Sequence, residues 1–181
     1  MSILQASWAK NWHRDWVPTR FPVPMQLDLG PFLLSPLTPR WNDTDYLAVM
    51  ASRERLRHLF RPGDSWPQDD HSPEKNREDL LWHEQEFYAR RSFAWVVQDE
   101  RRRYLGCVYL YPGRMESDTA EAFFWMGGHR SDWQAGEADM ARWFRDWFSF
   151  WPLKKVLFPG RELAWDSWAG AGLAHYGEAT R

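Results

Sequence analysis

The segment FAWVVQDERRRYLGCVYLYP, residues 93–112, decides the fold class. It holds two runs of aromatic and β-branched residues, Phe93–Val97 and Tyr104–Tyr111, which the charged residues Asp99–Arg103 separate. Such runs favour β-strands, and a short polar connection between them is typical of an antiparallel hairpin. A third run of the same kind, Ala120–Met126, follows after a polar stretch. The centre of the chain therefore predicts three antiparallel strands.

After these strands the hydrophobic period changes to that of a helix. Apolar residues recur there at intervals of three and four, namely Met140, Trp143, Phe144, Trp147, Phe148 and Trp151. The pattern predicts an amphipathic helix from Glu137 to Trp151, with Trp147 central to the core. Lys155–Phe158 predicts a further short strand, and Arg161–Trp168 predicts a last helix.

The first half of the chain predicts one short strand followed by helices. Phe32–Leu34 favours a strand that can pair with Met25–Leu29. Helix signals at Asn42 and at Ser52 predict two short helices. Ser72–Pro73 predicts the start of a longer one, because serine caps a helix and proline suits its first position. The buried stripe of that helix is expected to comprise Leu80, Leu81, Glu84, Phe87 and Tyr88.

Composition indicates a folded globular chain and restricts its partners. With 181 residues, 44% hydrophobic and 27% charged, the chain can bury a core of its own. Its 23 basic residues against 25 acidic ones give no footprint of a nucleic-acid binder. No apolar run could span a membrane, so we expect neither nucleic acid nor membrane as a partner. The single cysteine, Cys107, fits a reducing compartment, and we expect the cytoplasm.

Residues 1–24 are expected to form an arm before a domain that covers residues 25–181. The arm is broken by prolines, and Trp8, Trp12 and Trp16 lie four residues apart, on one face of a helix. An exposed apolar stripe needs a cover. Docking on the same domain is the favoured explanation, and docking on a second copy, which gives a homodimer, is the alternative.

Five segments resemble one protein family. They are AVMASRERL (Ala48–Leu56), Trp66–Pro67, HEQEF (His83–Phe87), LGCVYLYP (Leu105–Pro112) and FPGR (Phe158–Arg161). Together with the order of the expected elements, they resemble the GNAT family of N-acetyltransferases over roughly residues 31–173. The resemblance implies an α/β (α+β) fold, with a mixed, mostly antiparallel central sheet flanked by helices. It also implies acetyl transfer from acetyl-CoA to a small-molecule or protein amine.

The resemblance implies where acetyl-CoA binds. In this family the cofactor adds to the open edge of a strand and rests its pyrophosphate on the start of the next helix. Backbone N–H groups at a helix start attract anions, and a glycine lets phosphates approach closely. The matching residues are Phe124, Trp125 and Met126 in the strand and Gln134, Ala135, Gly136 and Glu137 at the turn.

The turn departs from the family motif in two ways. Gln134 lies one position too close to Gly136, and Glu137 adds a negative charge where the phosphates would bind. A plain glycine turn that opens a core helix is therefore an equal alternative.

Two glutamates are candidates for the base that takes a proton from the amine. Glu121 resembles the family's position for this base, and Glu84 is a carboxylate on an apolar stripe. An ion pair or a solvated position is the more frequent explanation for each. Trp66 in a polar loop and Arg161 at a strand end are candidates for substrate binding. For Arg161 a structural ion pair is equally well supported.

Several other residues are not expected to act in catalysis or metal binding. Cys107 is interpreted as a small buried hydrophobe. The six histidines show no ligand spacing, so we expect no metal site. Trp168 falls where many family members place a tyrosine that protonates the leaving thiolate, which an indole cannot do. The sequence leaves two functions open: an N-acetyltransferase, or a GNAT-like module that binds a ligand or a partner without turnover.

Overall fold

The protein is built around one six-stranded sheet. The computed structural model describes residues 16–116, 118–127 and 132–180. The strands lie side by side in chain order, β1-β2-β3-β4-β5-β6, antiparallel except for the parallel pair β5–β6. Their bounds are β1 Leu27–Leu29, β2 Phe32–Pro36, β3 Phe93–Gln98, β4 Tyr104–Pro112, β5 Thr119–Met126 and β6 Lys155–Leu157. The expected mixed, mostly antiparallel sheet is confirmed.

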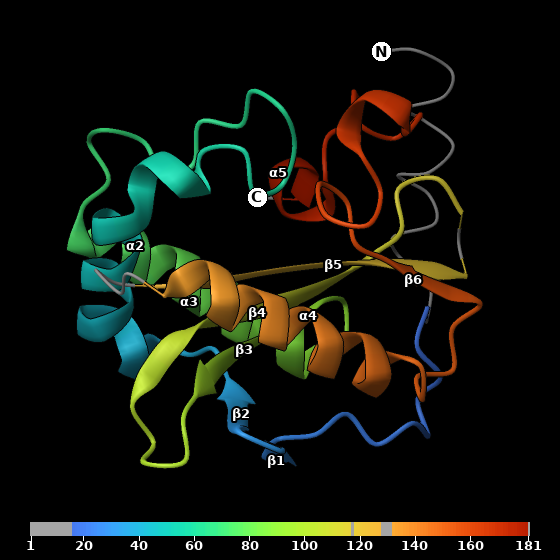
Figure 1. Cartoon of the computed structure of the whole chain (residues 1–181), viewed down its shortest axis with the longest axis horizontal. Coiled ribbons are helices and arrows are strands. Elements are labelled where there is room, and N and C mark those ends of the chain that lie inside the picture. Colours follow the sequence, from blue (N-terminus) through green and yellow to red (C-terminus); the bar gives the residue numbers. More distant parts are fainter. Residues whose placement is uncertain (1–15, 117, 128–131, 181) are drawn as a thin grey trace.

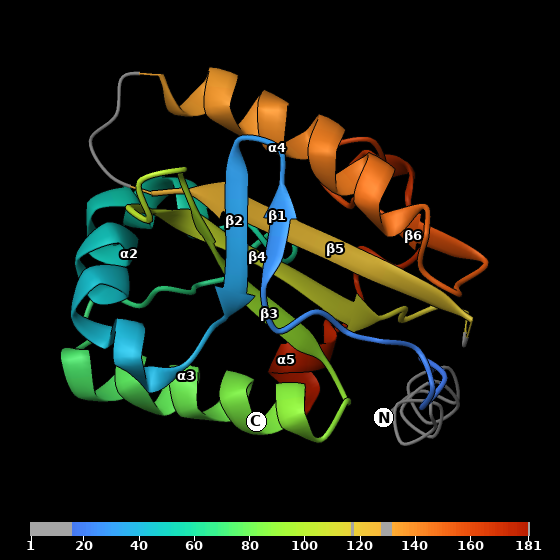
Figure 2. The same cartoon turned by 90° about the horizontal axis from the view of Figure 1, so that it is seen from below.

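Helices cover both faces of this sheet. Figure 2 shows α4 along one face and α2, α3 and α5 on the other. The helical bounds are η1 Pro39–Trp41, α2 Asn42–Leu56, α3 Pro73–Tyr88, α4 Trp133–Phe148, η2 Trp165–Ser167 and α5 Tyr176–Thr180. Neighbouring strand residues point to opposite faces, so Phe124 joins the core beneath α4, and Phe123 joins the core beneath α2 and α3.

Helix α3 begins where its sequence predicts, but it buries a different stripe. The Ser72 hydroxyl accepts a hydrogen bond from the backbone N–H of Lys75 at 3.3 Å, and Pro73 follows it. Leu80 and Phe87 are buried, whereas Leu81 is 44% exposed and Tyr88 63% exposed. The prediction for Leu81 and Tyr88 is wrong because each lies about 100° around the helix from its buried neighbour.

Two other helix predictions are wrong. The two expected short helices are the single helix α2, in which Ser52 is buried inside the helix and does not cap a new one. Arg161–Trp168 is no α-helix. Gly160 has a φ of +76°, and its N–H bonds Leu163 O at 2.8 Å, which closes a turn where the helix was expected.

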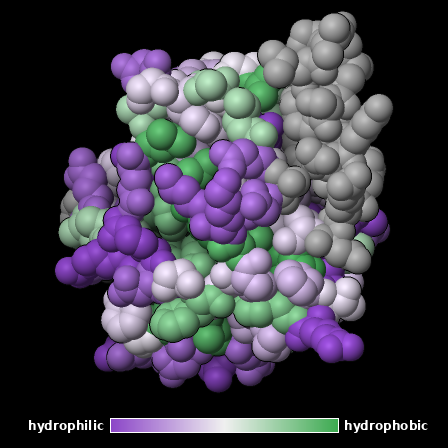
Figure 3. All heavy atoms as spheres, turned by 90° about the vertical axis from the view of Figure 1, so that its right-hand side faces the viewer, coloured by the Kyte–Doolittle hydropathy of each residue, from purple (hydrophilic) through white to green (hydrophobic). Residues whose placement is uncertain are grey.

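The start of the described chain packs on the domain itself. Trp16 and Val17 are buried, the Trp16 indole N–H donates to Arg91 O at 2.9 Å, and its ring lies 5.7 Å from that of Phe93. Trp16 therefore covers its own domain, whereas Trp8 and Trp12 lie outside the described residues. On the side of the molecule that carries β6, the apolar side chains visible outside the grey atoms lie between polar ones (Figure 3). In the described parts of the chain, no helix combines the length and apolar character that a membrane crossing requires.

Candidate functional site

Strand β5 loses its parallel partner halfway along its length. Thr119–Glu121 pairs with Lys155–Leu157. In the part of the chain that the structure describes, β5 then continues to Met126 with β4 as its only strand partner. Figure 1 shows β6 beside one end of β5 alone, with α4 crossing in front of the sheet. An unpaired strand edge presents N–H and C=O groups that must find other partners. We call the edge at Phe124–Met126 the β5 edge.

Side chains of the protein itself bond the β5 edge. Arg161 Nη2 donates to Phe124 O at 2.8 Å, and Arg55 Nη2 donates to Met126 O at 2.7 Å. The backbone N–H of Met126 donates to Glu137 Oε1 at 3.0 Å. Glu137 is 6% exposed and also accepts from Arg55 Nη1 at 3.1 Å and Arg161 Nη2 at 2.7 Å. We call Arg55, Glu137 and Arg161 the edge triad.

The turn at the start of α4 differs from the predicted phosphate turn. The N–H of Gly136 donates to Asp132 O at 3.0 Å, so it is not free to bind a phosphate. A β-carbon at Gly136 would lie 2.4 Å from Met126 Sδ, which shows that the glycine makes room for Met126. Gln134 and Ala135 are exposed. Glu137 bonds the Met126 N–H, so an extended ligand could pair with this N–H only after the carboxylate had moved away.

Glu121 is part of a buried ion pair. Its Oε1 accepts from Arg114 N at 2.9 Å and its Oε2 from Arg114 Nε at 2.8 Å, and the two side chains are 1% and 0% exposed. Burial raises the pKa of Glu121, and the Arg114 guanidinium opposes the rise. Arg114 also donates to Leu173 O at 2.7 Å and lies over the Trp168 ring at 4.8 Å. The pair thus ties the C-terminal segment to β5, which is the structural alternative to a catalytic role.

Glu84 lies away from both the β5 edge and the core. It is half-buried in a shallow surface hollow with Arg40, Arg77 and Tyr88, so its expected place on the buried stripe is wrong. The buried carboxylate of α3 is Glu86, which accepts from Arg91 Nε and from the Tyr176 hydroxyl, each at 2.7 Å. Glu84 and Glu121 are therefore not brought together.

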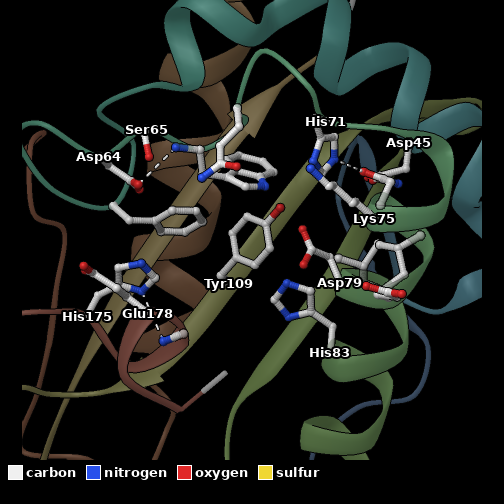
Figure 4. A pocket seen from close by; sticks show the side chains of 18 of the residues that line it. Asp45, Asp64, Ser65, His71, Lys75, Asp79, His83, Tyr109, His175 and Glu178 are labelled. Atoms are coloured by element: carbon white, nitrogen blue, oxygen red, sulfur yellow. Dashed lines mark hydrogen bonds between the residues drawn. The ribbon is translucent and has the colours of Figure 1, made fainter.

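A cavity of about 360 Å³ opens between the α2–α3 loop, α3, β4 and α5. Trp66 lines it, together with Phe60 and Tyr109, whose apolar rings form part of its wall. Its carboxylates outnumber its lysine and arginine side chains, which are Arg61 and Lys75. The acids are Asp45, Asp64, Glu78, Asp79 and Glu178, and the histidines His71, His83 and His175 also line the cavity. Figure 4 shows Tyr109 in the middle of this view, with Asp64 to one side and Asp79 and His83 to the other. We call it the acidic cavity.

The acids of this cavity differ in how far they are neutralised. Glu178 is bonded by Arg61 through two contacts of 2.7 Å. Asp45 accepts from the Tyr104 hydroxyl at 2.6 Å, and burial raises its pKa. Asp64 accepts at Oδ1 from the N–H of Trp66 at 3.1 Å, while its buried Oδ2 has no hydrogen-bond partner within the described chain. Burial also raises the pKa of Asp64. A cationic group is the natural partner for Asp64 Oδ2.

The two sites are separated by aromatic packing. Among the described residues, none of β5 lines the acidic cavity. The Phe60 ring on its wall packs against Phe123 of β5, with ring centroids 5.2 Å apart. An amine in the cavity must therefore pass Phe60 to reach β5.

The predicted site residues are thus dispersed, and two groups of them mark candidate sites. Phe124, Met126, Glu137 and Arg161 meet at the β5 edge, so Arg161 lies there and not with Trp66. The side chain of Trp125 points to the opposite face and donates to the Tyr109 hydroxyl at 3.1 Å. Sequence reasoning missed Arg55, although it lies in the segment Ala48–Leu56, and Asp64, which no local motif distinguishes. No group of three or more potential metal ligands is found in the residues that the structure describes.

Comparison with known proteins gives a fold and no close relative. No protein-family model matches the sequence, and no curated protein matches it. Among solved structures, a probable acetyltransferase shares 14% identity, with 74% of this chain and 72% of that chain covered and a TM-score of 0.56. The microcin C7 self-immunity acetyltransferase, solved with acetyl-CoA and AMP, shares 8% identity over 75% of this chain and 73% of its own, with a TM-score of 0.54.

A third similar structure is the Salmonella typhimurium acetyl transferase that modifies the N-terminal serine of ribosomal protein L7/L12. It shares 8% identity over 68% of this chain and 67% of its own, with a TM-score of 0.51. Similarity at such low identity reports architecture alone. The protein therefore has the fold of the GNAT acetyltransferases.

Proposed function

We propose that the protein is an N-acetyltransferase that takes a cationic amine in the acidic cavity and acetyl-CoA at the β5 edge. The observation that carries the proposal is the edge itself. Among the described residues, β5 has no parallel partner after Glu121, and side chains bond the edge-facing backbone groups of Phe124 and Met126. Such groups can pair with the amide groups of an extended ligand. When bound, acetyl-CoA supplies the activated acetyl group.

The residues of the acidic cavity support an amine as the acceptor. Its acids draw a positive charge, and the rings of Phe60, Trp66 and Tyr109 offer apolar and cation–π contact to an alkylammonium group. An ammonium must lose a proton before its nitrogen can attack a carbonyl carbon. We assign Asp64 Oδ2 to take that proton. This oxygen has no hydrogen-bond partner in the described chain, and burial raises the pKa of the Asp64 carboxyl group.

A second candidate function is amine binding without turnover. Two observations favour it: the edge triad bonds the β5 edge, and Arg114 neutralises Glu121 inside the protein. The separation of the cavity from β5 by Phe60 and Phe123 points the same way. The two candidates differ in one measurable result, because only the acetyltransferase releases the coenzyme A thiol when acetyl-CoA and an alkylamine are both present.

We also propose a cytoplasmic location and a homodimer. Cys107 is buried and unpaired, as expected of a protein from a reducing compartment. Trp16 is covered by its own domain, so the test of the dimer addresses the residues before it. Light scattering should give twice the 21.7 kDa chain mass for the full chain and a single chain mass after deletion of residues 1–15. A single chain mass for the full-length protein would contradict the dimer.

A further inference from the structure

The edge triad joins three distant parts of the chain at one point. Arg55 comes from the last turn of α2, Glu137 from the second turn of α4, and Arg161 from the segment after β6. Glu137 accepts from Arg55 Nη1, from Arg161 Nη2 and from the Met126 N–H, at 3.1, 2.7 and 3.0 Å. The carboxylate therefore occupies the place at which a ligand would bond the β5 edge.

The charges of the triad do not balance. Two guanidinium groups surround one carboxylate, which leaves a surplus of one positive charge. The side chain of Glu137 is 8% exposed, whereas those of Arg55 and Arg161 are 25% and 29% exposed, so both arginines still reach solvent. Arg161 Nε and Nη1 donate to no residue in the parts of the chain that the structure describes. A guanidinium has five N–H donors, and these remaining ones can bind a phosphate.

Both arginines are held in place by contacts other than Glu137. Arg55 donates to Met126 O at 2.7 Å and lies over the Trp133 ring at 4.0 Å. Arg161 donates to Phe124 O at 2.8 Å and lies over the Phe124 ring at 4.0 Å. These contacts would keep both guanidinium groups at the β5 edge after the carboxylate had moved away.

The usual anion contact at the start of α4 is not available at Gly136. The N–H of Gly136 is bonded to Asp132 O, and the Met126 side chain covers the face of the glycine. The two arginines are the cationic groups that contact the edge among the described residues, and a phosphate-bearing ligand can bond them there.

We propose that Arg55 and Arg161 bind the phosphate groups of the acyl donor, and that Glu137 occupies their site until the donor displaces it. The inference rests on the proposed function in that it takes the donor to be a coenzyme A thioester. It assigns the phosphate contact to side chains of α2 and of the segment after β6, not to the glycine turn.

The test measures ligand binding without turnover. Glu137→Gln removes the charge and keeps the size of the side chain, so coenzyme A and inorganic pyrophosphate should each bind roughly tenfold more tightly to it than to the wild type. The double variant Glu137→Gln/Arg161→Met should lose that gain in affinity. Arg161 is removed in the Glu137→Gln background because removing it alone would leave the Glu137 carboxylate without one of its partners. Glu162→Gln removes a partly exposed carboxylate that pairs with Arg145 elsewhere and serves as the control. Thermal melts check that each variant folds, and calorimetric titration gives the affinities.

Each result decides one of the two claims. Equal pyrophosphate affinity for Glu137→Gln and the wild type would overturn the inference, as would equal affinity for Glu137→Gln and Glu137→Gln/Arg161→Met. If coenzyme A then still bound, the proposed function would stand with its phosphate contact elsewhere. A third result is that pyrophosphate binds Glu137→Gln more tightly than the wild type and than Glu137→Gln/Arg161→Met, while neither the wild type nor Glu137→Gln binds coenzyme A. The anion site would then stand, and the proposed donor would be wrong.

Discussion

At the scale of single residues, Asp64 is the group whose surroundings point most directly to a cationic ligand. We predict that Asp64→Asn weakens the binding of a primary alkylamine by about 2 kcal/mol, because removing one member of a close charge pair typically costs at least this much. Calorimetric titration measures it. Asp69→Asn is the matched control, since the Asp69 side chain is 80% exposed and lies outside the cavity lining. Equal amine affinities for the wild type and Asp64→Asn would remove Asp64 from the site.

The Glu121–Arg114 pair leads to a prediction about stability. Glu121→Gln leaves the Arg114 charge buried without its partner, and we expect it to lower the free energy of unfolding by about 3–5 kcal/mol. Chemical denaturation measures the change. The double variant Glu121→Gln/Arg114→Met should recover part of the loss, because it removes both charges. A Glu121→Gln protein as stable as the wild type would mean that the pair contributes little to the fold and would reopen a catalytic role for Glu121.

Among the helices and strands, α4 shows how closely the spacing of apolar residues predicts which side chains are buried. Trp147 is 9% exposed and stacks on Phe148 at 4.5 Å, whereas Trp143 on the same helix is 36% exposed. We predict that Trp147→Ala lowers the free energy of unfolding by about 3–5 kcal/mol, the usual cost of truncating a buried large aromatic residue. Trp143→Ala should cost clearly less. Similar losses for the two variants would show that the helix buries a different face.

The elements themselves could largely be predicted from the sequence, and the errors have local causes. The strands within residues 93–126 could be predicted because aromatic and β-branched runs alternate there with polar turns. Ser72–Pro73 correctly predicted the start of α3. The prediction of the buried stripe of α3 was wrong for Leu81 and Tyr88. It gave their apolar character more weight than their position around the helix axis. The prediction of a helix at Arg161–Trp168 was wrong because Gly160 adopts a positive φ and turns the chain there. Composition does not reveal that backbone angle.

At the scale of the whole molecule, the candidate site was much less predictable than the fold. The strand edge at Phe124–Met126 could be located from the order of elements, but its partners could not. Arg55 lies 82 positions before Glu137, and Arg161 lies 24 positions after it, so no local pattern brings the three together. The acidic cavity likewise combines the α2–α3 loop with the C-terminal helix. Such contacts arise from the tertiary fold, which sequence spacing does not encode directly.

Acetyl transfer by this protein can be measured as the release of the coenzyme A thiol from acetyl-CoA in the presence of a primary alkylamine. We predict release that requires the amine, falls in Asp64→Asn and is unchanged in Asp69→Asn. Parallel titration of acetyl-CoA into the wild type and Glu137→Gln reports whether the donor binds. No thiol release by the wild type, together with no acetyl-CoA binding to either protein at millimolar concentration, would contradict the proposal that this fold acts as an acetyltransferase.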